Sequence, residues 1–558
     1  MGMPSFQAAN AIVYLTYGAM LAMGLAVSYY FTKKTGFLSG NGTQKALPLA
    51  LNFVASAMGC GILFTYPEIA AIAGVQGLLV YGLSSALPIL MFAFLGPKIR
   101  RATPHGFVLT EWARERYGPI TGLYLSFFTI ATIFLYIVSE LTSIQYCIES
   151  LTTMNSLAVM IVEAIITTIY TSWGGFHTSF ITDNIQGGMV LLLLIICSIA
   201  MGTQVHIDTS VIKPSGLLGA SKLGWQLIYI FPIAIATNDC FLSGFWLRTF
   251  ASRSDKDLLI GTSIATFIIL VFLVVTGVTG LLASWSGLLL PDKSDASYSF
   301  FYILLELPAW VVGFVLVFIV MLSTATFDSL ESSMVSTISN DVFRNRLKLI
   351  WVRFLVVLVM IPSIVVATRA PNILTIFLIS DLISAAVVPS LLLGLWSKMY
   401  FISGWEIIVS GLGGILSVFI FGTIYYNSAL EGAKLIILQN GLYVDDWSAF
   451  GAFAVAPGGG LIFGAIMLVL RLSFLYIRSR VKGIPFTALD KPFPKTTATT
   501  ELLDNEDDDS TDKYGATQST VPVNNNPTIR YFDNFFDFDE SNKWKSMFFV
   551  NNKESKID

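Results

Sequence analysis

The sequence predicts an all-α integral membrane protein with about thirteen transmembrane helices. Of its 558 residues, 54% are hydrophobic and only 12% are charged, whereas an ordinary soluble domain has about 25% charged residues. The mean hydropathy is +0.71. Apolar runs near 20 residues recur along most of the chain, and each is long enough to cross a hydrocarbon layer of about 30 Å as a helix. The lipid bilayer is therefore the expected surrounding of the chain.

Each expected helix is an apolar run bounded by polar residues, glycine or proline. In chain order the expected helices cover residues 9–31, 46–66, 69–95, 120–148, 154–172, 181–203, 224–244, 257–284, 309–337, 349–368, 371–397, 403–425 and 447–477. The first run lacks the basic flank and cleavage site of a secretory signal, so it is interpreted as a membrane helix. From about residue 483 the tail is too polar to form a core, which predicts disorder.

Lysine and arginine collect in alternate loops, and this asymmetry predicts the orientation of the chain. The clusters follow the first, third, seventh, ninth, eleventh and thirteenth expected helices. They consist of Lys33, Lys34 and Lys45, then Lys98, Arg100, Arg101, Arg114 and Arg116, then Arg248, Arg253 and Lys256, then Arg344, Arg346 and Lys348, then Lys398, and then Arg478, Arg480 and Lys482. The N-terminus is therefore expected to be extracellular and the C-terminal tail cytoplasmic.

The second expected helix contains two glycines near its middle. Gly59 and Gly61 lie one residue apart, and two glycines weaken a helix. A break there would free backbone carbonyls inside the membrane. Close packing against a neighbouring helix is the alternative explanation of the glycines.

Four stretches of the chain carry distinctive motifs. Met321–Asp341 has a hydroxyl pair and a later serine pair, and Tyr170–Gln186 has Gly-Gly, Thr-Asp and Gln. The other two are Phe107–Gly118, preceded by Lys98–Pro104, and Gly244–Arg253. These stretches resemble the sodium:solute symporter family, most closely the urea permeases of fungi and plants. The resemblance covers about residues 10–480. It implies a LeuT-like core of two inverted five-helix repeats, with the binding site at the membrane midplane.

The domain division that follows from this resemblance has five parts. They are an extra N-terminal helix and cytoplasmic loop (1–44), the first repeat (45–205), the second repeat (206–398), two further helices (399–482) and a disordered cytoplasmic tail (483–558). Within the tail, an aromatic patch is a candidate docking segment for cytosolic regulators, and an adhesive disordered stretch is the alternative; the patch consists of Tyr531, Phe532, Phe535, Phe536 and Phe538.

The resemblance implies a solute:cation symporter that moves urea, polyamines or both across the plasma membrane by alternating access. Sodium or protons would drive it, and no cofactor beyond the coupling ion is expected. A non-transporting nutrient sensor of the same fold and a passive channel for a small solute are the alternatives. No catalytic or zinc-binding motif occurs, and His105, His177 and His206 lie apart, so neither an enzyme nor a nucleic-acid-binding protein is indicated.

The family's cation site joins the second and ninth expected helices. By resemblance it maps onto backbone carbonyls near Met58, Gly61 and Val320 and onto the hydroxyls of Ser323 and Thr324. These oxygen ligands suit sodium, which is a hard cation. The alternative is that the two hydroxyls bond back to their own helix.

Ionisable side chains inside the apolar runs form a second group of candidates. They are Glu140, Glu163, Asp239, Asp328 and Asp381, with Arg353 as the comparable cation. Each costs roughly 3 kcal/mol at a helix centre, so it should face a cavity or a partner. The expected solute pathway contains Glu140, Asn238, Asp239 and Asp381, whereas Asp328 and Glu331 are expected to be solvated or at a gate.

The excess of carboxylates favours a cationic solute such as a polyamine, or a proton carried on an acid, over neutral urea alone. Each carboxyl group taken singly can instead be a protonated or hydrogen-bonded packing group.

The orientation can be tested by cysteine labelling on intact cells. A cysteine in place of Lys434 should react with an impermeant thiol reagent, and one in place of Lys45 should not, because the two positions are expected on opposite sides. The parent chain, whose four cysteines lie in apolar runs, is the background control. The reverse labelling pattern would invert the topology.

Overall fold

The computed structural model describes residues 2–490 except 32–39, 105, 107, 206, 208, 345, 371, 440 and 443–445. The described chain is helical and contains no β-strand. Eleven of its helices are long and apolar enough to span a membrane. The number is twelve if the bent pair of α9 (Lys222–Asp239) and α10 (Ser243–Ala251) counts as one span. The all-α membrane fold is confirmed, but the predicted count of thirteen is not. The predicted helix 46–66 accounts for the difference, because it is broken into shorter pieces.

The long helices follow most of the predicted apolar runs. They are α1 (Phe6–Phe31), α6 (Pro119–Leu151), α7 (Ser156–Gln204), α11 (Asp255–Trp285), α13 (Ala309–Thr337), α14 (Leu349–Ala367), α15 (Ile373–Leu392), α16 (Gly404–Tyr426) and α18 (Ser448–Lys482). Shorter helices lie between them, namely α4 (Pro88–Ala102), α5 (Leu109–Tyr117), α8 (Thr209–Ile212), α12 (Ser299–Leu305) and α17 (Ala429–Ile436). Helix α7 contains two candidate membrane spans, Ser156–Trp173 and Thr178–Thr203, which match the predicted helices 154–172 and 181–203.

The first helix break lies between α2 (Ala46–Ala57) and α3 (Ile62–Ala86). Met58, which follows α2, has an extended backbone with φ −109° and ψ 91°, so the break at the glycine pair is confirmed. The next change of direction is not at residues 67–68 as predicted. It lies at Gly74, whose φ of 70° favours glycine. A Cβ atom there would also lie 2.3 Å from the Leu217 carbonyl oxygen.

The second helix break lies between α9 (Lys222–Asp239) and α10 (Ser243–Ala251), which are bent by 63°. The sequence predicts one helix over 224–244 and a basic loop after it. Instead α9 ends five residues earlier than predicted, at Asp239, and the following segment forms a helix whose side chains are buried.

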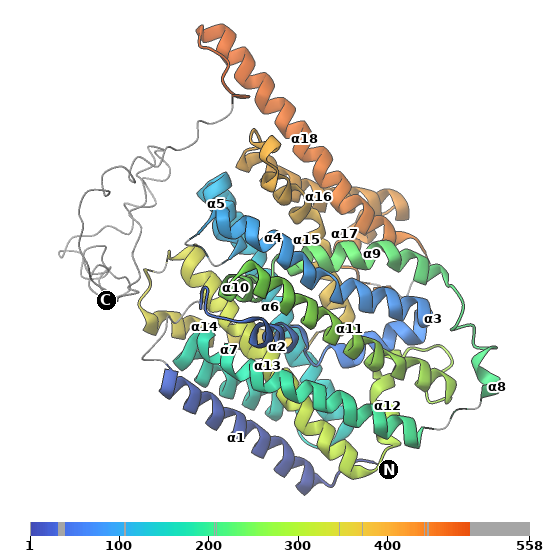
Figure 1. The fold of residues 1–558 in the computed structure, drawn as a ribbon. Coiled ribbons are helices and arrows are strands. Elements are labelled where there is room, and N and C mark those ends of the chain that lie inside the picture. The colour runs from blue at the N-terminus through green and yellow to red at the C-terminus, as the bar shows by residue number, and fades with distance from the viewer. Residues whose placement is uncertain are drawn as a thin grey trace.

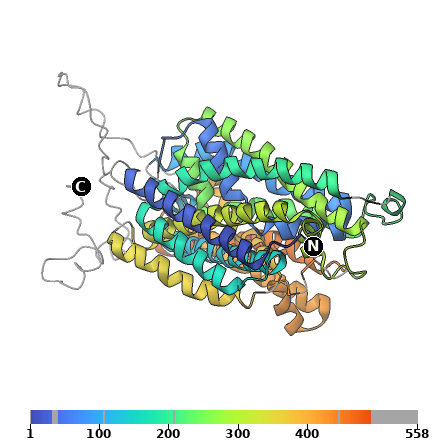
Figure 2. The ribbon, with the colours of Figure 1, turned by 90° about the horizontal axis from the view of Figure 1, so that it is seen from below.

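Helix α13 runs through the middle of the bundle (Figure 1). Within its membrane span 78% of the residues are buried, against 6% for α18. Helix α1 packs on α7 and α13 at one edge, and α16 packs on α18 at the opposite edge. Figure 2 shows α1 on the outside of the bundle. The polar residues of α13 therefore face other helices and not lipid.

Parts of the predicted organisation lie outside the described residues. They include the tail beyond residue 490 as well as His105 and His206.

Candidate solute and cation site

A cavity of about 140 Å³ lies between the two helix breaks. Gly59 and Gly61 line it from the first break, and Asp239 and Ser243 line it from the second. A space of this size holds several water molecules or a slender solute. Broken helices that meet at a cavity expose backbone polar groups where a bound solute or ion can use them.

Two matched pairs of side chains face the cavity from α6 and α15. On α6 an aromatic ring and a carboxylate, Tyr136 and Glu140, lie one helical turn apart, and on α15 Phe377 and Asp381 repeat the pattern. The rings of Tyr136 and Phe377 pack with centroids 4.9 Å apart. The cavity wall thus combines negative charge with aromatic surface.

Asp239 brings a third carboxylate to the cavity from the last residue of α9. It lies close enough to Asp381 for the two carboxylates to interact electrostatically. The C-terminal end of a helix carries partial negative charge and attracts cations. No described residue offers a countercation to either carboxylate, and Asp381 Oδ1 is buried without a hydrogen-bond partner.

Whereas Asp239 lies at the C-terminal end of α9, the side chain of Glu140 on α6 contacts the N-terminal end of α3. Its Oε1 accepts a hydrogen bond of 2.7 Å from the backbone N–H of Cys60, just before α3. The N-terminal end of a helix stabilises an anion. A Cβ atom at Gly59 would lie 2.3 Å from Glu140 Oε2, so the glycine makes room for the carboxylate. Gly59 thus lies at the confirmed helix break and also allows a close approach of α6.

Asn238, predicted to belong to the solute pathway, lies behind the cavity wall. It donates a hydrogen bond to the Tyr136 hydroxyl and accepts one of 3.0 Å from Ser380. It is fully buried and does not line the cavity. Its observed role is to brace α6, α9 and α15 around the cavity.

Helix α13 contacts the first break near two of the predicted cation ligands, Met58 and Gly61. Thr326 of α13 donates a hydrogen bond of 2.8 Å to the Met58 carbonyl, and Cys60 Sγ approaches the Ile319 carbonyl at 3.2 Å. Gly61 lines the cavity beside this contact. The Met58 carbonyl thus contacts the helix that carries Ser323 and Thr324, and the cation site itself stays a prediction.

The two predicted hydroxyl ligands differ in their surroundings. Thr324 donates a hydrogen bond of 2.6 Å to the Val320 carbonyl of its own helix, which is the alternative left open by the sequence. Ser323 Oγ is buried and has no partner with hydrogen-bond geometry. An orphaned buried oxygen fits a role in cation binding, because leaving it unsatisfied costs about 1–3 kcal/mol.

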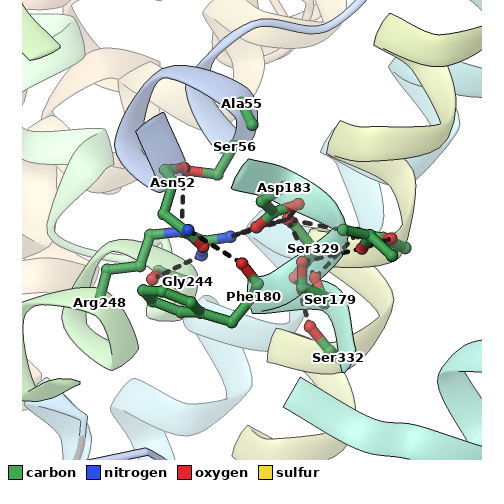
Figure 3. A network of polar contacts seen from close by, with 12 residues as sticks. Asn52, Ala55, Ser56, Ser179, Phe180, Asp183, Gly244, Arg248, Ser329 and Ser332 are labelled. Carbon is green, nitrogen blue, oxygen red and sulfur yellow. Dashed lines mark hydrogen bonds and ion pairs between the residues drawn. The ribbon is translucent and has the colours of Figure 1, made fainter. Parts of the chain in front are cut away.

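A buried ion pair lies beside the cavity, and one of its members, Arg248, lines it (Figure 3). The guanidinium of Arg248 on α10 donates to Asp183 of α7 at 2.5 Å, and both side chains are fully buried. It also donates to the backbone carbonyls of Asn52 and Gly244 and to the Ser329 hydroxyl. Arg248 therefore joins α2, α7, α10 and α13.

Asp328 extends this network on α13. Its carboxylate accepts hydrogen bonds of 2.7 Å from Tyr170 and 2.9 Å from Ser179. Glu331 accepts one of 2.6 Å from Thr168. Both carboxyl groups are fully buried, so the expectation that they are solvated is wrong. The hydroxyls of α7 supply the polar environment that water would otherwise provide.

The roles of Arg248 and Asp183 are not predicted by the sequence. Arg248 was assigned to a cytoplasmic loop, whereas it is the one fully buried lysine or arginine among the described side chains. A local signal existed, since Trp246, Leu247 and Phe250 give its neighbourhood an apolar character. Arg353, the predicted buried cation, has a side chain outside the described part of the structure.

No family model matches the chain. The chain is 56% identical to a spermidine transporter of Candida albicans over 491 residues, which are 88% of this chain and 94% of that protein. It is 27% identical to the urea active transporter of Saccharomyces cerevisiae over 202 residues, 35% of this chain and 27% of that protein. A sodium-coupled sialic acid symporter in an outward-open state has a similar fold, with a TM-score of 0.64 at 15% identity over 82% of this chain and 98% of that one.

Removing the buried cation should destabilise the protein. Arg248→Met keeps the length of the side chain but leaves Asp183 without its countercharge, which costs about 3 kcal/mol or more. We expect a lower melting temperature in detergent, measured by fluorescence-detected gel filtration, and partial recovery in the double variant with Asp183→Asn. Arg253→Met, at an exposed position, is the matched control. A parent-like melting temperature for Arg248→Met would show that the pair does not hold the helices together.

Proposed function

The chain belongs to the family of fungal spermidine and urea active transporters, and we propose that it is a symporter whose main solute is a polyamine. It is a multi-pass membrane transporter and not an enzyme. The choice of solute rests on the excess of negative charge in the cavity. Glu140, Asp239 and Asp381 line it. The one cation among the described residues that line it, Arg248, is already paired with Asp183.

The charge of the cavity favours a solute with several positive charges. Alkyl amines like that of lysine ionise with a pKa of about 10.4, so a polyamine carries several ammonium groups at neutral pH. Three carboxylates on three different helices can meet such groups one by one. Neutral urea gains nothing from this arrangement, so its transport is the secondary possibility, supported by the urea transporters among the relatives.

The apolar parts of the cavity wall suit the rest of a polyamine. Tyr66 and Tyr81 stack with ring centroids 3.9 Å apart, and both line the cavity together with Tyr136 and Phe377. Aromatic faces attract ammonium groups, and Ile133 and Leu273 offer surface to methylene segments. The wall therefore combines anionic and apolar groups, as a polyamine combines ammonium and methylene groups.

A coupling cation at the first break would link ion binding to the shape of the cavity. Met58, Gly61, Val320, Ser323 and Thr324 provide oxygen atoms there, and oxygen is the ligand that hard cations prefer. A cation held between α13 and the break would fix the position of α3, which lines the cavity. Sodium or a proton would then drive solute uptake across the plasma membrane, with the N-terminus outside.

The two alternative functions predict different behaviour of purified protein. A nutrient sensor would bind spermidine without exchanging it across a membrane, and a passive channel would ignore ion gradients. Counterflow of labelled spermidine in proteoliposomes, with and without an imposed gradient, separates both from a symporter.

Neutralising the cavity carboxylates should weaken spermidine uptake selectively. Loss of one partner of a buried charge pair costs about 2 kcal/mol or more, so Asp239→Asn or Asp381→Asn should raise the half-saturating spermidine concentration about thirtyfold. Uptake of labelled spermidine and urea in cells that lack their own transporters measures this effect. Urea uptake, where present, should change less.

Asp292→Asn is the matched control for this experiment, because Asp292 is an exposed loop carboxylate. Surface expression should be equal in all variants. Parent-like spermidine affinity in both cavity variants would show that these carboxylates are packing groups and would remove the physical basis for a polyamine.

Removing the two hydroxyls on α13 tests the cation site. The double variant Ser323→Ala, Thr324→Ala should raise the half-saturating concentration of the coupling ion at least about tenfold, because two oxygen ligands are lost, while protein abundance stays near that of the parent. Ser332→Ala, whose hydroxyl bonds back to the Ser329 carbonyl at 3.1 Å, is the control on the same helix. An unchanged ion dependence of uptake would place the cation elsewhere.

A further inference from the structure

Glu163 on α7 is a buried carboxyl group with no role in the cavity. It is 0% exposed, and neither of its carboxyl oxygens has a partner with hydrogen-bond geometry among the described residues. It does not line the cavity. An isolated ionised carboxylate in such a place costs several kcal/mol, so Glu163 must share its position with something that neutralises it.

The groups around Glu163 come from four segments of the chain. Ser323 of α13 lies beside Glu163 and also beside Glu140, although it forms no hydrogen bond of proper geometry with either. Tyr17 of α1 lies beside Glu163 with an equally partnerless hydroxyl. The titratable groups that face Glu163 are Tyr17 from α1, Glu140 and Cys147 from α6, Cys60 from the first break and Glu331 from α13.

None of these groups is a cation, and two of them are further carboxyl groups. Two carboxylates that interact in a medium of low dielectric constant cannot both stay ionised without a bound cation or proton. The hydroxyl of Ser323, buried between Glu140 and Glu163, is an unsatisfied polar group that can both accept and donate a hydrogen bond. The three side chains together thus form a site that is short of positive charge.

We propose that Glu163, Glu140 and Ser323 form a binding site for the coupling proton, with Glu163 as its buried end. This inference rests on the proposed transport function and assigns the ion that drives it. Glu140 lines the cavity, so its carboxyl group receives a proton from cavity water. Ser323 Oγ accepts that proton while it donates its own to Glu163, which leaves Glu140 ionised and the hydroxyl unchanged.

The composition of the site favours a proton over a metal ion. Beside Glu163 the described side chains are two hydroxyls, two thiols and two carboxyl groups. Thiols are poor ligands for hard metal cations, whereas each of these six groups can carry a proton.

The position of the site couples the proton to the solute. Glu140 bonds to the backbone of Cys60 at the first break and faces the same cavity as Asp239 and Asp381. When the proton moves on to Glu163, Glu140 regains the negative charge that attracts a cationic solute. When the proton returns, that charge is lost and the solute is released.

The test uses the full chain in proteoliposomes with the membrane potential clamped at zero by valinomycin and equal potassium. The outside solution is one pH unit more acidic than the inside. If one proton moves with each solute, the parent should accumulate labelled spermidine to an inside-to-outside concentration ratio of about ten. Glu163→Gln should reach a ratio of about one and still exchange spermidine at equal pH. Glu149→Gln, an exposed glutamate on α6, should accumulate spermidine like the parent.

The outcomes separate this proposal from the proposed function. A parent without saturable spermidine exchange contradicts transport itself. A Glu163→Gln variant that still accumulates spermidine about tenfold overturns the proton site. Accumulation driven by a sodium gradient at equal pH, and lost in Glu163→Gln, would make the site a sodium site and overturn the proton assignment.

If Glu163→Gln does not fold, Ser323→Ala provides the second test. It removes a hydroxyl without adding or removing charge. The pH of half-maximal spermidine exchange should move in this variant, because the link between the two carboxyl groups is lost, and an unmoved midpoint overturns the proposal.

Discussion

The buried pair of Arg248 and Asp183 is the interaction on which the arrangement of the site depends. An arginine inside a bilayer is tolerated only where its donors are satisfied, and Arg248 reaches four segments of the chain to achieve this. Its bonds to Asn52, Gly244, Asp183 and Ser329 tie both broken helices to α7 and α13. The two breaks therefore face one cavity.

Helix α13 separates two polar environments, and its sequence shows why. Thr326, Ser329, Leu330 and Ser333 recur at helical spacing and line the cavity. Asp328 and Glu331 lie on another face and bond to α7. Because the helix is surrounded by protein, hydroxyl and carboxyl groups can cover most of its circumference without contact with lipid. A helix of this composition is stable only at the centre of a bundle.

The sequence predicts the long helices well, because apolar length alone determines whether a segment spans a bilayer. The break at Gly59 and Gly61 was also predictable, since glycine is a local signal. The break after Asp239 carries no glycine, and its position depends on packing against distant segments. Arg248 was placed in a loop because a basic residue near the end of an apolar run usually lies at the membrane surface.

In the candidate site, too, features set by nearby residues could be predicted from the sequence, and features set by contacts with distant residues could not. Intramembrane carboxylates are visible in the sequence, and Glu140, Asp239 and Asp381 indeed share one cavity. The role of Asn238 as a brace and the burial of Glu331 depend on partners more than a hundred residues away. No periodicity or composition reveals such pairs.

The uncompensated carboxylates of the cavity have a consequence for membrane voltage. One elementary charge that crosses a potential of 100 mV gains or loses about 2.3 kcal/mol. A carrier whose empty cavity is negative is pushed toward the outward-facing state by an inside-negative potential, whereas a polycation cancels that charge in the loaded state. The electric field of the cell would then act mainly on the return of the empty carrier, and the solute itself would cross as part of a nearly neutral complex.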